Sequence, residues 1–203
     1  PKRAKPDNFT PFPFGNADQK DSVLTNVDYD KLNKSVNTIF SNNTQTRAVV
    51  VFHKNQIIAE KYDTGFTKNS KILGWSMTKS IMSTVIGIMQ KQGKINVNDN
   101  APISAWKNDD RKNITINNLL QMNSGLEWDE DYNSISDVSK MLFLEKDMTT
   151  VQIEKPFVGK SNETWNYSSG TSNLLSGIIR SKFNSHQAYL DYWYAEFIDK
   201  IGM

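Results

Sequence analysis

The chain has 203 residues, of which 37% are hydrophobic and 23% charged, and its formal net charge is +2. This composition suits one sizeable core or two small ones, favours neither nucleic acid nor a membrane surface as partner, and contains no apolar run long enough to span a bilayer. The absence of cysteine excludes disulfides, thiolate metal sites and a cysteine nucleophile, and two isolated histidines are too few for a metal cluster, so we expect no metal and no cofactor.

The first part of the chain predicts an arm, a helix and a hairpin. Residues 1–27 are polar and interrupted by prolines, which indicates an extended N-terminal arm. Asp28 is a good N-cap for a short amphipathic helix, because apolar residues follow it at helical spacing. The segments 48–52 and 57–62 are rich in β-branched residues and flank a polar break, which predicts a β-hairpin. Residues 28–75 are thus expected to hold a helix and a β-hairpin.

From residue 76 to residue 203 the pattern predicts a mainly helical region. Apolar residues recur at helical spacing after Ser76, after the capping residue Thr115, and in segments near 138–145, 174–183 and 188–197. The acidic run 127–131 is expected to be a solvated loop, with Trp128 as a candidate lining residue of a cleft.

Ser76 and Lys79 open the apolar segment that continues to Gly93. Three residues apart, their side chains share one face of a helix. A serine becomes a nucleophile when a neighbouring base takes its proton, and a lysine kept neutral in a dry pocket is such a base. The pair is therefore a candidate acyl-transfer site, and we expect the Ser76 hydroxyl and the Lys79 amine within hydrogen-bonding distance. From residue types alone, an N-cap serine and a solvated lysine are the alternative.

Other catalytic patterns are absent or lack a suitable context. A second Ser-x-x-Lys match at Ser104 and Lys107 falls in a segment of loop composition, so we interpret it as accidental. Thr78 stands where a Gly-x-Ser-x-Gly elbow needs its second glycine. The sequence also lacks a His-Glu-x-x-His zinc motif and a Gly-x-Gly-x-x-Gly nucleotide motif.

Tyr167 is the second candidate for proton transfer. It precedes Ser168, Ser169 and Gly170 immediately before a predicted helix, so a loop is expected to present its phenol from a rigid support. A phenol near Ser76 and Lys79 would relay protons between them and a leaving group. The alternative is that Tyr167 packs its ring while Ser169 or Thr171 caps the helix.

Six segments together resemble one known family, the penicillin-recognising serine hydrolases, and within it the class C β-lactamase-like branch. The matching segments are Glu60-Lys61-Tyr62, Ser76-Met77-Thr78-Lys79, residues 93–99, residues 114–126, Tyr167-Ser168-Ser169-Gly170 and Ile201-Gly202-Met203. The resemblance implies Ser76 as nucleophile, Lys79 as its base partner, Tyr167 as the second proton-handling residue and Ser169 as a substrate-binding residue. It also implies an α+β fold of the β-lactamase/transpeptidase type, with an antiparallel sheet flanked by helices beside a mostly helical region.

Two departures from the family pattern refine these expectations. Relatives of the class C branch carry Tyr-x-Asn where this chain has Tyr167-Ser168-Ser169, and Tyr-Ser-Ser-Gly is more similar to the nylon-oligomer hydrolases and related esterases. The family's third motif, on a late strand that supplies an oxyanion-hole amide, has no counterpart here. We therefore expect residues 28–203 to be the N-terminal part of a catalytic domain, completed by C-terminal strands from a separate fragment or another copy, and weakly active alone.

The resemblance implies a serine hydrolase that cleaves an ester or amide through an acyl-enzyme on Ser76, acting on small-molecule esters, amides or lactams. The alternatives are a D-alanyl-D-alanine carboxypeptidase (a penicillin-binding protein) or a β-lactamase, and, from another class, a non-catalytic ligand-binding module on the same scaffold. The family also suggests a periplasmic or secreted bacterial protein.

Overall fold

The computed structural model describes residues 10–19, 23–41 and 45–203. The chain divides into two compact units, residues 1–73 together with 197–203, and residues 74–196. Part of the expected N-terminal arm, including Phe9, lies outside the described residues. Among the described residues, no helix is long and apolar enough to cross a membrane.

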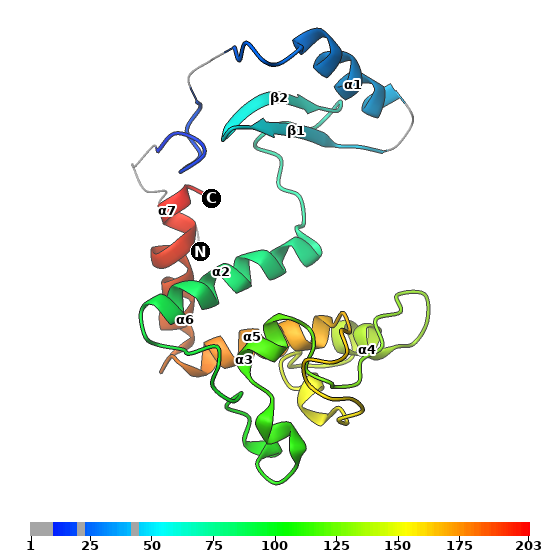
Figure 1. Ribbon diagram of the computed structural model, residues 1–203, viewed down its shortest axis with the longest axis vertical. Coiled ribbons are helices and arrows are strands. Elements are labelled where there is room, and N and C mark those ends of the chain that lie inside the picture. Colours follow the sequence, from blue (N-terminus) through cyan, green and yellow to red (C-terminus); the bar gives the residue numbers. More distant parts are fainter. Residues whose placement is uncertain (1–9, 20–22, 42–44) are drawn as a thin grey trace. The chain divides into compact units, whose positions relative to one another are not determined.

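The first unit contains the helices α1 (Tyr29–Ser41) and the short α7 (Asp199–Ile201) and a two-stranded antiparallel sheet (Figure 1). The strands of the sheet are β1 (Ala48–His53) and β2 (Gln56–Tyr62). The described part of the arm is folded back at a turn rather than fully extended, because the Phe12 N–H donates to the Ala17 carbonyl. Phe12 then stacks on Phe52 with ring centroids 4.9 Å apart.

The hairpin is longer and its turn tighter than the sequence predicts. His53 pairs with Gln56, so the strands meet around only two residues, Lys54 and Asn55. Both adopt positive φ, 48° and 60°, as a two-residue turn between twisted strands requires. The Gln19 side chain bonds the β2 backbone at Ile57 in both directions, donating to its carbonyl at 2.7 Å and accepting from its N–H at 2.9 Å. A side-chain amide thus occupies part of the strand edge.

The second unit is a helical assembly built on α5 (Ser169–Ser181) (Figure 1). Helix α5 packs against α2 (Thr78–Lys91), α3 (Ile116–Leu120), α4 (Asp137–Phe143) and α6 (His186–Trp193). The core takes Val85 and Met89 from α2 and Leu174 and Ile179 from α5, all nearly inaccessible to solvent. Together, the two units give an α+β chain.

Short turns complete this unit. They are the 3-10 turns η1 (Trp75–Met77), η2 (Ser104–Trp106), η3 (Asp110–Asn113) and η4 (Val151–Glu154). The π-turn η5 (Tyr194–Ile198) begins in this unit and ends beyond its last residue, Glu196. The π-turn interrupts the continuous helix expected near 188–197. The acidic run is not simply a solvated loop, because Trp128 is buried in a cluster with Val138 and Met141.

Candidate active site

Ser76 lies in the 3-10 turn η1 that leads into α2. The preceding residue, Trp75, has a positive φ of 44°, a costly conformation for a bulky side chain that is often found at functional sites. The side chain of Ser76 is exposed and caps neither η1 nor α2. Its hydroxyl is therefore not used as the N-cap that residue types alone suggest, and its backbone amide lies in a first turn, where amides lack carbonyl partners.

Lys79 points from the first turn of α2 toward two serine hydroxyls. Its Nζ atom lies 3.1 Å from Ser76 Oγ and 3.2 Å from Ser169 Oγ. The same atom lies 4.9 Å from the centre of the Tyr167 ring. Half-buried Lys79 thus contacts both Ser76, in the turn before α2, and Ser169, in the helix that follows Tyr167. The distance between Ser76 and Lys79 agrees with the expected hydrogen bond.

Tyr167 approaches the pair with its ring rather than with its hydroxyl. The ring face is turned to Lys79 Nζ, an arrangement that attracts an ammonium group. Its phenol makes no hydrogen bond with any residue that the structure describes, whereas a phenol close to both Ser76 and Lys79 is expected from the sequence. A catalytic role for the phenol therefore stays a prediction.

The first turn of α5 is built from small, buried residues. Ser168, not Ser169 or Thr171, is the N-cap, and its side chain accepts from the Thr171 N–H at 2.9 Å. This leaves the Ser169 hydroxyl free for Lys79, although only 8% of Ser169 is accessible. The structure thus places Ser169 between protein groups, and substrate binding by Ser169 stays a prediction.

Glu130 is the site residue that sequence reasoning missed. Its carboxylate accepts from the Ser169 N–H at 2.9 Å and also from the Ser169 hydroxyl. It further accepts from the Tyr132 hydroxyl at 2.7 Å and from the Trp128 indole N–H. The only signal in the sequence was the acidic run itself, in which nothing distinguishes Glu130 from its neighbours.

The hydrogen bonds to Glu130 stabilise its ionised form. Burial raises the pKa of this carboxyl, but donors from Ser169, Tyr132 and Trp128 outweigh burial and hold the pKa below its usual value. In turn, partial burial and the bond to the Glu130 carboxylate raise the pKa of Tyr132. A carboxylate is therefore present beside Ser169 at neutral pH.

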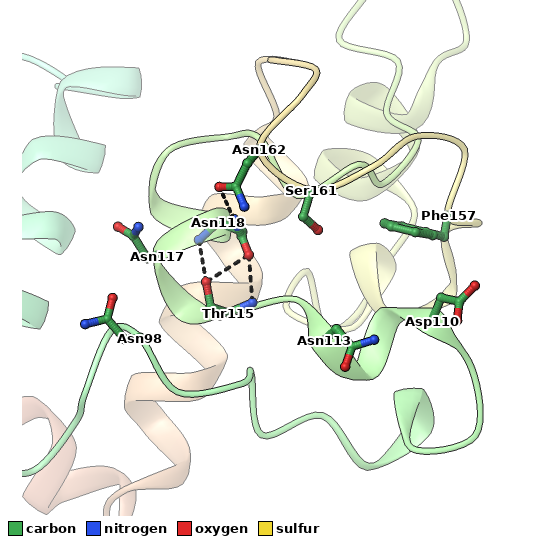
Figure 2. Close-up of a pocket in the computed structure, with 9 residues that line it drawn as sticks. All are labelled: Asn98, Asp110, Asn113, Thr115, Asn117, Asn118, Phe157, Ser161 and Asn162. Carbon is green, nitrogen blue, oxygen red and sulfur yellow. Dashed lines mark hydrogen bonds between the residues drawn. The ribbon is translucent and has the colours of Figure 1, made fainter.

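A separate pocket of about 530 Å³ lies near α3 and is lined mainly by amides (Figure 2). Neither Ser76, Lys79 nor Tyr167 lines it. Asn118 in its wall is committed to internal bonds, since it accepts from the Thr115 hydroxyl at 2.8 Å and donates to Asn162 at 2.7 Å. These bonds, dashed in Figure 2, join α3 to the loop at Asn162 and give the buried amide a structural role.

Comparison with known proteins supports the family suggested by the motifs. A family model described as Beta-lactamase matches residues 36–203. A solved structure, a putative 6-aminohexanoate-dimer hydrolase from Bacillus anthracis, shares 18% sequence identity with a TM-score of 0.59. The match covers 73% of this chain and 43% of that one, so the chain spans less than half of that protein's length. At this identity the similarity shows a shared fold.

The comparison with curated proteins gave no match. The family model nevertheless extends over most of the sequence and includes Ser76, Lys79, Glu130 and Tyr167. The chain therefore belongs to the beta-lactamase family.

Proposed function

We propose that the protein is a serine hydrolase that cleaves an ester or amide through an acyl-enzyme on Ser76. The observation that carries this proposal is the Lys79 amine, which lies 3.1 Å from the Ser76 hydroxyl. A nucleophile and its base within hydrogen-bonding reach, with a third group orienting the base, form the arrangement that covalent catalysis needs. Ser169 is that third group.

In the first step neutral Lys79 takes the Ser76 proton as Oγ attacks the substrate carbonyl carbon. The carbonyl oxygen becomes an oxyanion, and the amides at the start of the turn that holds Ser76 favour its negative charge. When the tetrahedral intermediate collapses, the bond to the alcohol or amine breaks and a proton donor protonates the leaving group. The proton that Lys79 took from Ser76 then replaces the one this donor gave, so Lys79 is neutral again before the second step. The product is an ester between Ser76 and the acyl group.

In the second step a water molecule loses a proton to the same base and attacks the acyl-enzyme. The carboxylic acid product departs and Ser76 regains its proton. The protonated amine formed in each half-reaction is stabilised by Ser169 Oγ, 3.2 Å away, and by the Tyr167 ring. We assign to the Tyr167 phenol, which has no bond to a described residue, the delivery of a proton to the leaving group.

Esters and linear amides are the proposed substrates in preference to lactams. Ser169 stands where class C β-lactamases carry an asparagine whose amide would hold a lactam side chain, and Ser169 is buried. The similarity in fold to a putative 6-aminohexanoate-dimer hydrolase agrees with this preference. Penicillin labelling of Ser76 with slow release would favour the penicillin-binding alternative, and rapid lactam turnover would favour a β-lactamase.

Labelling with a fluorophosphonate, followed by peptide mass spectrometry, tests the proposal. We expect one modified serine, Ser76, and no modification in Ser76→Ala. Ser104→Ala is the matched control, because Ser104 belongs to the other Ser-x-x-Lys match. The described hydrogen bond between the two residues runs from the Lys107 backbone N–H to the Ser104 carbonyl and does not involve the serine hydroxyl. Label on another serine, or full hydrolysis by Ser76→Ala, would show that Ser76 is not the nucleophile. A protein that takes no label and hydrolyses no ester would be the binding module.

A further inference from the structure

The Glu130 carboxylate is surrounded by hydrogen-bond donors on both of its oxygens. One oxygen accepts from the hydroxyls of Ser169 and Tyr132. The other accepts from the Ser169 backbone N–H and from the Trp128 indole N–H. These groups are 39 residues or less apart in sequence, and all belong to the second unit. The arrangement places an ionised acceptor in hydrogen-bond contact with Ser169, the serine that Lys79 also contacts.

An ionised carboxylate accepts hydrogen bonds and donates none. The Ser169 proton is therefore directed at Glu130, and Ser169 Oγ offers Lys79 only its lone pairs. Lys79 must then donate an N–H to Ser169, whether the amine is charged or neutral. In the neutral amine this leaves the lone pair for the neighbouring hydroxyl, that of Ser76, at 3.1 Å.

We propose that Glu130 is a positioning residue that fixes the direction of the hydrogen-bond chain from Ser76 through Lys79 and Ser169. This inference rests on the proposed function, since it concerns how the base is aimed at its nucleophile. Protons run one way along the chain, from Ser76 to Lys79, from Lys79 to Ser169 and from Ser169 to Glu130. If the Ser169 proton pointed at Lys79 instead, it would occupy the lone pair of the neutral amine. That lone pair would then be unable to accept the Ser76 proton.

A purely structural role for Glu130 is the competing explanation. Its bond to the Ser169 N–H places a negative charge at the N-terminus of α5, which stabilises a helix in any protein. The same carboxylate holds the loop that carries Trp128. The test must therefore reverse the direction of the hydrogen bond between Ser169 and Lys79. It must keep the hydrogen bonds that residue 130 makes to the N-terminus of α5 and to Trp128.

Glu130→Gln makes this separation, because the surrounding donors decide how the new amide is oriented. The Ser169 backbone N–H and the Trp128 indole N–H donate and cannot accept, so the amide oxygen must face them. The amide NH₂ then faces the hydroxyls of Ser169 and Tyr132, which are able to turn and accept. The Ser169 proton is released from position 130 and turns toward Lys79, while the bonds at the helix terminus survive.

A double-mutant cycle on the full-length gene product measures the effect. We expect E130Q to slow fluorophosphonate labelling of Ser76 by about 10-fold to 100-fold, a loss typical of misaligned catalytic groups. In the Ser169→Ala background, E130Q should slow labelling less than twofold, because the serine through which Glu130 acts is gone. On ester substrates the loss should appear in kcat, with KM little changed. Glu127→Gln is the matched control, since Glu127 lies in the same acidic run and its side chain is exposed. The Glu127 carboxylate makes no hydrogen bond to a described residue.

Two results would overturn the inference. One is unchanged labelling in E130Q, and the other is an equally large E130Q effect with and without Ser169, which would show a direct charge effect or a folding defect. The side-chain ¹⁵N signal of Lys79 provides a readout that needs no activity. It should change in E130Q, whereas S169A and E130Q/S169A should give the same signal. Absence of label on Ser76 in the wild-type protein would refute the proposed function, and the Lys79 signal would still decide whether Glu130 acts through Ser169.

Discussion

Gly170 adjoins the proposed site at a point where Gln152 and Trp128 approach α5 closely. A Cβ atom added there would lie 2.3 Å from Gln152 Oε1 and 2.4 Å from a ring carbon of Trp128. Ordinary contacts begin near 3.4 Å, so each neighbour would have to retreat by about 1 Å. Neither has room to do so, because Gln152 is completely buried and Trp128 is 6% exposed.

We therefore expect Gly170→Ala to lower the free energy of unfolding. Overpacking of a filled core typically costs about 1–3 kcal/mol, and the better helix propensity of alanine returns at most about 1 kcal/mol. With the full propensity gain subtracted, the net loss is about 0–2 kcal/mol. Displacement of Trp128 also disturbs its bond to Glu130, so labelling of Ser76 should slow in the same variant.

Urea unfolding followed by circular dichroism measures the loss, with Gly87→Ala as the matched control. Gly87 is an exposed residue of α2, in the same unit, and a Cβ there would meet nothing within 4 Å. Only the propensity gain applies at Gly87, so this variant should be more stable by about 0.5–1 kcal/mol. A Gly170→Ala protein as stable as Gly87→Ala would refute the packing of α5 against Trp128 and Gln152.

Three further predictions concern the site and its supports. Tyr167→Phe keeps the ring that faces Lys79 and removes the phenol, so ester turnover should fall by about 10²-fold to 10⁴-fold with an unchanged circular dichroism spectrum. Folding lowers the pKa of Glu130, so the ionised carboxylate stabilises the folded protein. This contribution to the free energy of unfolding is complete above the ordinary glutamate pKa of 4.5 and is lost as pH falls through the lower pKa of the folded state. The difference in melting temperature between the wild type and E130Q should therefore shrink on acidification below that value. Asn118→Ala should lower the free energy of unfolding, measured with urea, by about 1–3 kcal/mol, because it breaks a buried capping box. Asn117→Ala is the control. The Asn117 side chain has no hydrogen bond to a described residue, so this variant should stay within about 0.5 kcal/mol of wild type.

The features that the sequence predicted well depend on neighbours along the chain. Ser76 and Lys79 are one helical turn apart, so their approach needs only a helix to form. Thr115 caps α3 through a residue three positions later, which is also local. In the hairpin the strand pairing was predicted, but the polar residues His53 and Gln56 were placed in the turn although they pair with each other. The polarity of a residue indicates that its side chain is exposed, but an exposed residue can lie in a strand as well as in a turn.

The features that the sequence did not predict depend on contacts between distant segments. Glu130 meets Ser169 across 39 residues, and nothing local marks which carboxylate of the acidic run makes that contact. Trp128, expected in a solvated loop, is buried because α4 packs beside it. The orientation of Tyr167 also depends on tertiary structure, since a loop residue of given identity is able to present either its ring or its hydroxyl.

The four residues of the Tyr-Ser-Ser-Gly segment are explained by four different demands on one helix start. Tyr167 faces Lys79, Ser168 caps α5, Ser169 bridges Lys79 and Glu130, and Gly170 leaves space for Trp128. A larger side chain at the last position would push away the same tryptophan whose indole bonds Glu130. If Glu130 directs the protons as proposed, packing and proton direction are coupled, because the tryptophan that requires a glycine in α5 also bonds the carboxylate that contacts Ser169. We therefore predict from the proposal that the small residues of this segment help to orient Lys79 toward Ser76, so substitutions that alter only packing should change the rate at which Ser76 reacts.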